Sequence, residues 1–141
     1  MSEAPRHLAR IVVLQTIYAT EHSEQELEAA FDSIANKEGL KEQHRKFATD
    51  LLNATIEKSQ WADEHIDALA ENWKLERIAF IDKVIMRMAM VELTTFIDVP
   101  VKVVLNEAIE LAKDFSTMKS SKFINGILDN FVKKQNQPTE E

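Results

Sequence analysis

The sequence has no cysteine and only two glycines and three prolines among its 141 residues. Without cysteine, a disulfide framework, a cysteine-ligated zinc site and thiol chemistry are excluded. The glycines, Gly39 and Gly126, lie far apart, which excludes a glycine-rich phosphate loop, a dinucleotide fingerprint and a nucleophile elbow. No apolar run reaches membrane-spanning length, and the first residues do not form a signal peptide. We therefore expect a cytoplasmic protein with no membrane association and no cofactor.

Basic residues are also in short supply, and the acidic excess is confined to one part of the chain. Lys plus Arg is 17 against 24 Asp plus Glu, for a net charge of −7. Residues 23–72 hold five basic and twelve acidic side chains, so the whole excess lies there. This balance argues against nonspecific polyanion binding, but it leaves room for local basic patches in the two neutral segments, 1–22 and 73–141.

Apolar residues recur every three or four positions, which predicts helices and no strands. Gly39 is the expected left-handed stop of one helix, and a break is expected near Ser59. The expected helix starts are marked by capping residues or by proline, at Ser2 with Pro5, at the capping-box sequence Ser23–Glu26, at Asn72, at Pro100 and at Ser120.

Six or seven helices with short links predict an all-α protein with one compact domain over residues 1–134. The Asn72 region divides this domain into two packed three-helix subdomains, residues 1–72 and 73–134. The polar segment 135–141 is expected to be a disordered tail.

Residues with catalytic or metal-binding chemistry are scattered. The four histidines, His7, His22, His44 and His65, fall in different segments, and His65 has no second histidine at helical zinc-site spacing. No Ser, His and Asp grouping has a recognisable setting. The sequence therefore predicts no catalytic site and no metal site.

Two long motifs occupy the C-terminal part of the chain, at residues 100–113 and 121–129. Asn125-Gly126 would normally mark a turn, yet Phe123, Ile127 and Phe131 continue a helical period through it. Glycine inside a helix costs about 1 kcal/mol relative to alanine. We expect close approach of another backbone at Gly126, either a neighbouring helix or a ligand strand.

These two motifs, with matching residues further upstream, resemble the NusB family of transcription antitermination factors over nearly the whole chain. The upstream matches are Arg10, Gln15, Tyr18, Trp73, Ile81-Asp82, Arg87, Ala89 and Glu92-Leu93. The resemblance implies an all-helical fold of two three-helix units. It also implies binding to the boxA element of nascent ribosomal RNA together with NusE, a ribosomal protein. That complex helps RNA polymerase to pass terminators.

The first candidate RNA-binding residues are Arg6, His7 and Arg10, which lie on or near one side of the first expected helix. A helix start with cations favours phosphate contact. The alternative is a pair of solvent-exposed arginines, which is common on any helix. The family often has a denser arginine run here, which His7 and Leu8 dilute.

The second candidate RNA-binding set is Lys119, Lys122, Phe123 and Asn125. Single-stranded RNA is bound by stacking of bases on aromatic rings, with nearby cations holding phosphates. Asn125 would bond a base edge or sugar hydroxyl, or else satisfy a neighbouring helix end. The alternative for Phe123 is a core position. We expect the two ends of the chain to pool these cations in one groove.

Tyr18 and Asp82 resemble family positions near the NusE-binding surface. The alternative is a half-buried tyrosine whose hydroxyl donates to Asp82. The alternative function is a helical protein-interaction module, or a homodimer, with a weakened RNA surface, and the acidic middle segment motivates it. An RNA methyltransferase with a similar helical domain is disfavoured because the chain has no glycine-rich cofactor loop.

Overall fold

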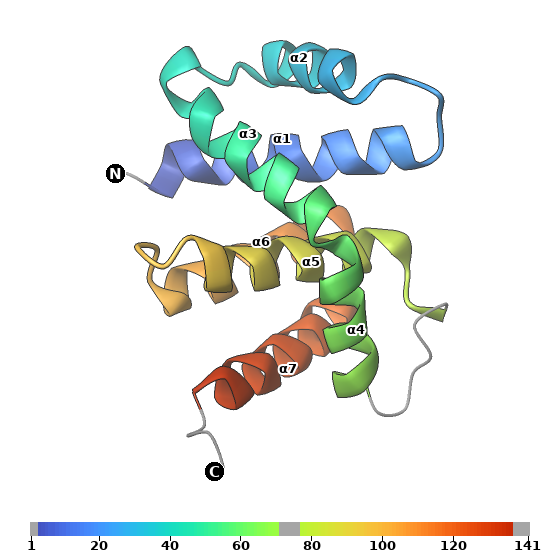
Figure 1. Ribbon diagram of the computed structural model, residues 1–141, viewed down its shortest axis with the longest axis vertical. Helices are drawn as coiled ribbons and strands as arrows, with labels where there is room; N and C mark the ends of the chain where they lie inside the picture. The colour runs from blue at the N-terminus through green and yellow to red at the C-terminus, as the bar shows by residue number, and fades with distance from the viewer. Residues whose placement is uncertain (1–2, 71–76, 137–141) are drawn as a thin grey trace. The chain divides into compact units, whose positions relative to one another are not determined.

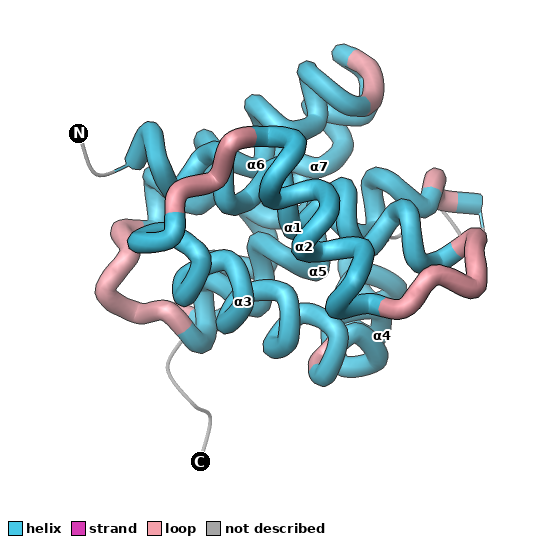
Figure 2. Tube along the Cα trace, turned by 90° about the horizontal axis from the view of Figure 1, so that it is seen from above, coloured by secondary structure: helices cyan, strands magenta, loops and turns pink. Residues whose placement is uncertain are grey.

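The computed structural model describes residues 3–70 and 77–136, and seven α-helices account for most of them. The helices are α1 (Glu3–Glu21), α2 (Leu27–Glu38), α3 (Glu42–Glu57), α4 (Ser59–Leu69), α5 (Phe80–Thr95), α6 (Val101–Phe115) and α7 (Met118–Gln135). Figure 2 shows only helices and loops in this part of the chain. The predicted all-α class is therefore confirmed, as are the predicted break near Ser59 and the helix that follows Pro100.

The chain divides into two compact units between Glu57 and Lys58. We expected the division at residue 72, which lies outside the described residues. The difference concerns α4, which packs on α5 and α7 and therefore belongs to the second unit. Ala62 and Ile66 of α4 are fully buried, and the Trp61 ring meets the Phe131 ring of α7 edge to face at 6.1 Å. The second unit thus contains four helices, where three were expected.

The first unit consists of α1, α2 and α3, with α1 in contact with both of the others. In Figure 1, α2 runs alongside α1 and α3 crosses it. Gly39 ends α2 in the left-handed conformation, at φ 78°, as predicted. Its N–H donates to the Asn36 carbonyl at 3.2 Å and the Leu40 N–H donates to the Ala35 carbonyl at 2.9 Å. These bonds satisfy the last carbonyls of α2 and turn the chain toward α3.

The second unit is built around α5, which packs against α4, α6 and α7. Met86, Met88 and Met90 of α5 are at most 2% exposed, so they belong to the core of this unit. The Arg87 guanidinium pairs with the Asp63 carboxylate of α4, so Arg87 joins two helices of this unit.

Two predicted helix caps are wrong. The Ser23 hydroxyl donates back to the Ala19 carbonyl at 2.9 Å, so it extends the end of α1 rather than capping α2. The start of α2 follows Glu26, which makes no side-chain capping bond. At the start of α7 the cap is Thr117, whose hydroxyl accepts the Ser120 N–H at 2.9 Å. At α7 several hydroxyl residues lie within about one turn, at 116, 117, 120 and 121, and sequence spacing alone did not choose among them.

Gly126 lies inside α7 with open space beside it. Among the described residues, no atom beyond the local helix backbone lies within 4 Å of the position that a Cβ would take. The expected close approach of a neighbouring helix is therefore wrong. Of the predicted tail, Gln135 is the last residue of α7 and Asn136 its C-cap. Ser2, Asn72, Trp73 and residues 137–141 lie outside the described residues.

Candidate functional site

The three N-terminal candidates lie in the first three turns of α1, beside a ring from α3. The Arg6 guanidinium carbon lies 4.5 Å from the centroid of the Phe47 ring, and that of Arg10 lies 5.3 Å from it. Because α3 packs on α1, it brings Phe47 to this position. Phe47 itself is half-buried. The structure thus adds an aromatic platform beneath the predicted cations.

The two arginines differ sharply in exposure. Arg10 is 1% exposed, whereas Arg6 and His7 are half-buried. Like charges one helical turn apart repel each other, and the electron-rich ring face of Phe47 attracts both guanidinium groups. Of the three candidates, Arg6 and His7 are thus accessible to a ligand, and Arg10 is not.

The C-terminal candidates lie in the first three turns of α7, in the second unit. Lys119, Lys122 and Asn125 are exposed, and Ile124 between them is fully buried. Phe123 is half-buried and lines a pocket at the start of α7. It is therefore neither a fully buried core residue nor a fully exposed surface residue. This half of the predicted set therefore presents two cations and an amide to solvent, close to a partly covered ring.

Asp82 lies in the first turn of α5 and is 5% exposed. Its Oδ2 accepts a hydrogen bond of 2.7 Å from the Ser120 hydroxyl of α7. A bond from the Tyr18 hydroxyl to Asp82 stays a prediction. Tyr18 is 47% exposed on α1, and its ring meets the His22 ring edge to face at 5.7 Å.

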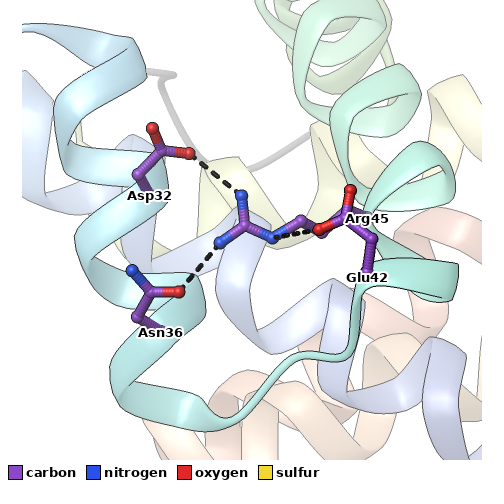
Figure 3. A network of polar contacts seen from close by, with 4 residues as sticks. All are labelled: Asp32, Asn36, Glu42 and Arg45. Atoms are coloured by element: carbon purple, nitrogen blue, oxygen red, sulfur yellow. Dashed lines mark hydrogen bonds and ion pairs between the residues drawn. The ribbon is translucent and has the colours of Figure 1, made fainter.

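A second, larger groove lies between α2 and α3, and acidic side chains dominate its lining. Arg45 lies within it and donates to Asp32 and to Asn36 at 3.1 Å each (Figure 3). Its Nε lies 3.9 Å from a Glu42 oxygen. Arg45 therefore neutralises part of the acidic charge and ties α3 to α2.

Sequence reasoning missed three residues of these surfaces. Phe47 was missed because its partners are on another helix, and no local spacing records that contact. Ser120 was assigned to a cap, and its bond to Asp82 spans 38 positions. Arg77 lines the pocket at the start of α5, and its only signal was a basic residue just before a helix start.

Residues 3–70 and 77–136 contain no metal-binding cluster and no helix suited to crossing a membrane. No group of three or more histidine and acidic side chains is placed to hold a metal ion. None of the helices described there has both the length and the apolar character needed to cross a membrane.

Both units are helical, and each carries cations beside an aromatic ring in the first turns of a helix. These features define a class, small all-α proteins with basic side chains beside aromatic rings at helix starts. The model of the NusB family matches residues 7–133, which is most of the sequence, and the chain belongs to that family. The family prediction made from the sequence is confirmed.

Individual relatives agree with this assignment. The transcription antitermination protein NusB of Chloroherpeton thalassium is 42% identical over 125 residues, covering 88% of this chain and 59% of that protein. The chain thus spans less than two thirds of that relative's length. The NusB proteins of Salinibacter ruber and Desulfitobacterium hafniense are 41% and 36% identical, with 78% and 93% of their lengths covered. These matches cover 88% and 96% of this chain.

Solved structures agree on the fold. The T. maritima NusB structure superposes with a TM-score of 0.83 at 30% identity, covering 92% of this chain and 91% of that one. A structure of antitermination factors NusB and NusE in complex with dsRNA has a TM-score of 0.81, covering 93% of this chain and 98% of that one. Its sequence identity is 18%, so this second likeness concerns the fold alone.

Proposed function

We propose that this protein is a non-enzymatic RNA-binding adaptor in transcription antitermination. It binds boxA-type single-stranded RNA of nascent ribosomal transcripts together with NusE, as part of an antitermination complex with RNA polymerase in the cytoplasm. The observation that carries the proposal is the family match over residues 7–133. The exposed cations beside aromatic rings support it, because single-stranded RNA is bound by such combinations.

In the first unit, the proposed phosphate contacts come from Arg6 and His7. Their position at the start of α1 adds the partial positive charge of the helix N-terminus. Arg10, at 1% exposure, takes a positioning role: with Phe47 it fixes the direction of the Arg6 side chain.

In the second unit, the proposed contacts are the ammonium groups of Lys119 and Lys122, the Phe123 ring and the Asn125 amide. The two lysines hold phosphates, and the ring stacks with a base. We propose that both units bind the same RNA strand. Tyr18 and Asp82 are the proposed contacts to NusE, and the exposure of Tyr18 suits it to this role.

Titration of fluorescently labelled boxA RNA into the full chain, with and without NusE, tests this function. We expect RNA binding, and we expect it to tighten when NusE is present. A variant with a scrambled boxA sequence is the control for nonspecific binding. Absence of an RNA signal in both conditions would contradict the proposal.

The second candidate function is a protein-interaction module, or a homodimer, with a weakened RNA surface. Two observations favour it: the acidic groove between α2 and α3, and the burial of Arg10, which leaves fewer cations exposed. Light scattering beside the RNA titration distinguishes the candidates. A dimer that binds no RNA supports the second candidate, and a monomer that binds boxA supports the first.

A further inference from the structure

Arg77 and Lys119 line the same pocket of the second unit, where α5 and α7 begin. The pocket has a volume of about 360 Å³, within the range of about 300–1,000 Å³ typical of small-ligand sites. Arg77 lies just before α5, and Lys119 lies in the first turn of α7. The polar and aromatic residues of its lining are Arg77, Asp82, Thr117, Lys119, Ser120 and Phe123. The fold therefore brings to one cavity two cations that are distant in the sequence.

A hydrogen bond between α5 and α7 fixes the two sides of this pocket. The Ser120 hydroxyl donates to Asp82 Oδ2 at 2.7 Å. Lys119 is the sequence neighbour of Ser120, and Arg77 lies a few positions before Asp82. Because the bond joins the first turns of the two helices, it holds the segment that carries Arg77 beside the segment that carries Lys119.

The accessible charges of the pocket are both positive. Arg77 and Lys119 are exposed, whereas Asp82 is 5% exposed and its carboxylate accepts from Ser120. Within residues 3–70 and 77–136, no acidic side chain forms an ion pair with Arg77 or with Lys119. Arginine and lysine side chains have N–H donors and no acceptor. The pocket therefore suits a ligand that brings acceptor oxygens and negative charge.

We infer that Arg77 is a further RNA contact, and that it holds one backbone phosphate of the strand in this pocket together with Lys119. The inference rests on the proposed function, and it adds a residue and the RNA group that this residue binds. A phosphodiester presents two unesterified oxygens, which match the planar fork of a guanidinium group, while the lysine supplies a point charge. The Phe123 ring, proposed to stack with a base, lines the same pocket. A base and its own phosphate therefore bind next to each other.

A phosphate contact carries no base preference. Arg77→Gln should therefore weaken the binding of boxA RNA and of a scrambled strand by the same factor, roughly three- to fivefold at low salt. Arg77→Lys keeps the charge and should retain most of the affinity. Lys102→Gln is the matched control, because it removes a charge at an exposed position of α6 outside the pocket, and it should bind like the wild type.

These affinities are measured by fluorescence anisotropy on the full chain, with and without NusE. Thermal melting of each variant verifies its fold, which exposed positions should leave unchanged.

A double variant tests whether the two cations share one phosphate. The slope of log affinity against log salt concentration falls by about 0.7 for each phosphate contact that is lost from a single strand. Arg77→Gln combined with Lys119→Gln should therefore reduce the slope by about 0.7, because one phosphate is released. A reduction of about 1.4 would mean that they hold separate phosphates, and it would overturn the shared site.

The outcomes separate this inference from the function on which it rests. If the wild type binds boxA and Arg77→Gln binds both strands equally well, the inference is overturned and the proposed function stands. A loss of affinity confined to boxA would indicate a base contact, which also overturns the inference. If Arg77→Gln weakens NusE binding and leaves RNA binding without NusE unchanged, Arg77 serves the protein partner and the inference is overturned. If the wild type fails to bind boxA even with NusE, the proposed function falls and the inference falls with it.

Discussion

The Arg87 guanidinium and the Asp63 carboxylate form two parallel hydrogen bonds of 2.8 Å each, and they join α5 to α4. The Arg87 side chain is 14% exposed and that of Asp63 is 22% exposed. The guanidinium also lies 5.5 Å from the centroid of the Phe80 ring. This pair therefore helps to hold α4 within the second unit, and it accounts for part of the difference from the predicted boundary at residue 72.

Asp63→Ala should destabilise the protein by about 1.5–3 kcal/mol, because it leaves a half-buried guanidinium without its partner. Denaturant unfolding followed by circular dichroism measures this change. Asp50→Ala is the matched control, since it removes a carboxylate from the exposed pair with Lys46. That variant should lower the free energy of unfolding by about 0.5 kcal/mol or less. If the two variants lost equal amounts of stability, the structural role of Arg87 would be contradicted.

Phe47→Leu should weaken boxA binding by about three- to tenfold, since it removes the ring that orients Arg6. The free energy of unfolding should fall by less than about 1.5 kcal/mol, because the substitution keeps most of the side-chain volume. Phe31→Leu is the control, because its ring lies near Arg45 instead. Anisotropy titrations on both variants test the difference. If Phe47→Leu binds RNA like the wild type, the proposed platform is wrong.

Lys122→Glu should weaken boxA binding by roughly tenfold at low salt while leaving the melting temperature nearly unchanged, because Lys122 is exposed on α7. Lys102→Glu makes the same change of charge at an exposed position of α6 and should bind normally. Titration and thermal melting of both variants are needed. Unfolding of Lys122→Glu would show that its surface assignment is wrong.

Gly126→Ala should stabilise the protein by about 0.5–1 kcal/mol, because the helix gains propensity and the added Cβ meets open space. The melting temperature should then rise by about 2–4 °C. The predicted approach of a ligand strand at Gly126 implies weaker boxA binding by the same variant. If the variant melts at a higher temperature but binds boxA with unchanged affinity, no RNA strand approaches Gly126 and that prediction is wrong.

The helices could be predicted because their signals are local. Spacing of apolar residues gave all seven described helices once the break near Ser59 was included, and Gly39 marked the end of α2. The cap predicted at Ser120 was misplaced because the neighbouring Thr117 takes that role, and the one predicted at Ser23 because its hydroxyl bonds back to the Ala19 carbonyl of α1. The division between units depends on side-chain contacts of α4, which no local pattern records.

The candidate site could be predicted only in part. Their place on the expected helices identified Arg6, Lys119 and Lys122 as candidates, but spacing could not reveal that Arg10 is buried. Phe47 and the bond between Ser120 and Asp82 were missed, because both contacts join helices that are distant in the sequence. Local periodicity identifies a helix face, and tertiary packing decides what that face touches.

The salt dependence of boxA affinity tests most directly the central claim, that these cations bind RNA phosphates. Each phosphate that the protein neutralises releases counterions, so the slope reports the number of phosphates contacted. The association constant would be measured with NusE present over a series of KCl concentrations. The account predicts a slope of roughly −2 to −4 in a log–log plot, at about −0.7 for each phosphate contacted. The double variant Arg6→Gln with Lys122→Gln should reduce that slope by about 1.4. A wild-type slope near zero would contradict phosphate binding by these cations.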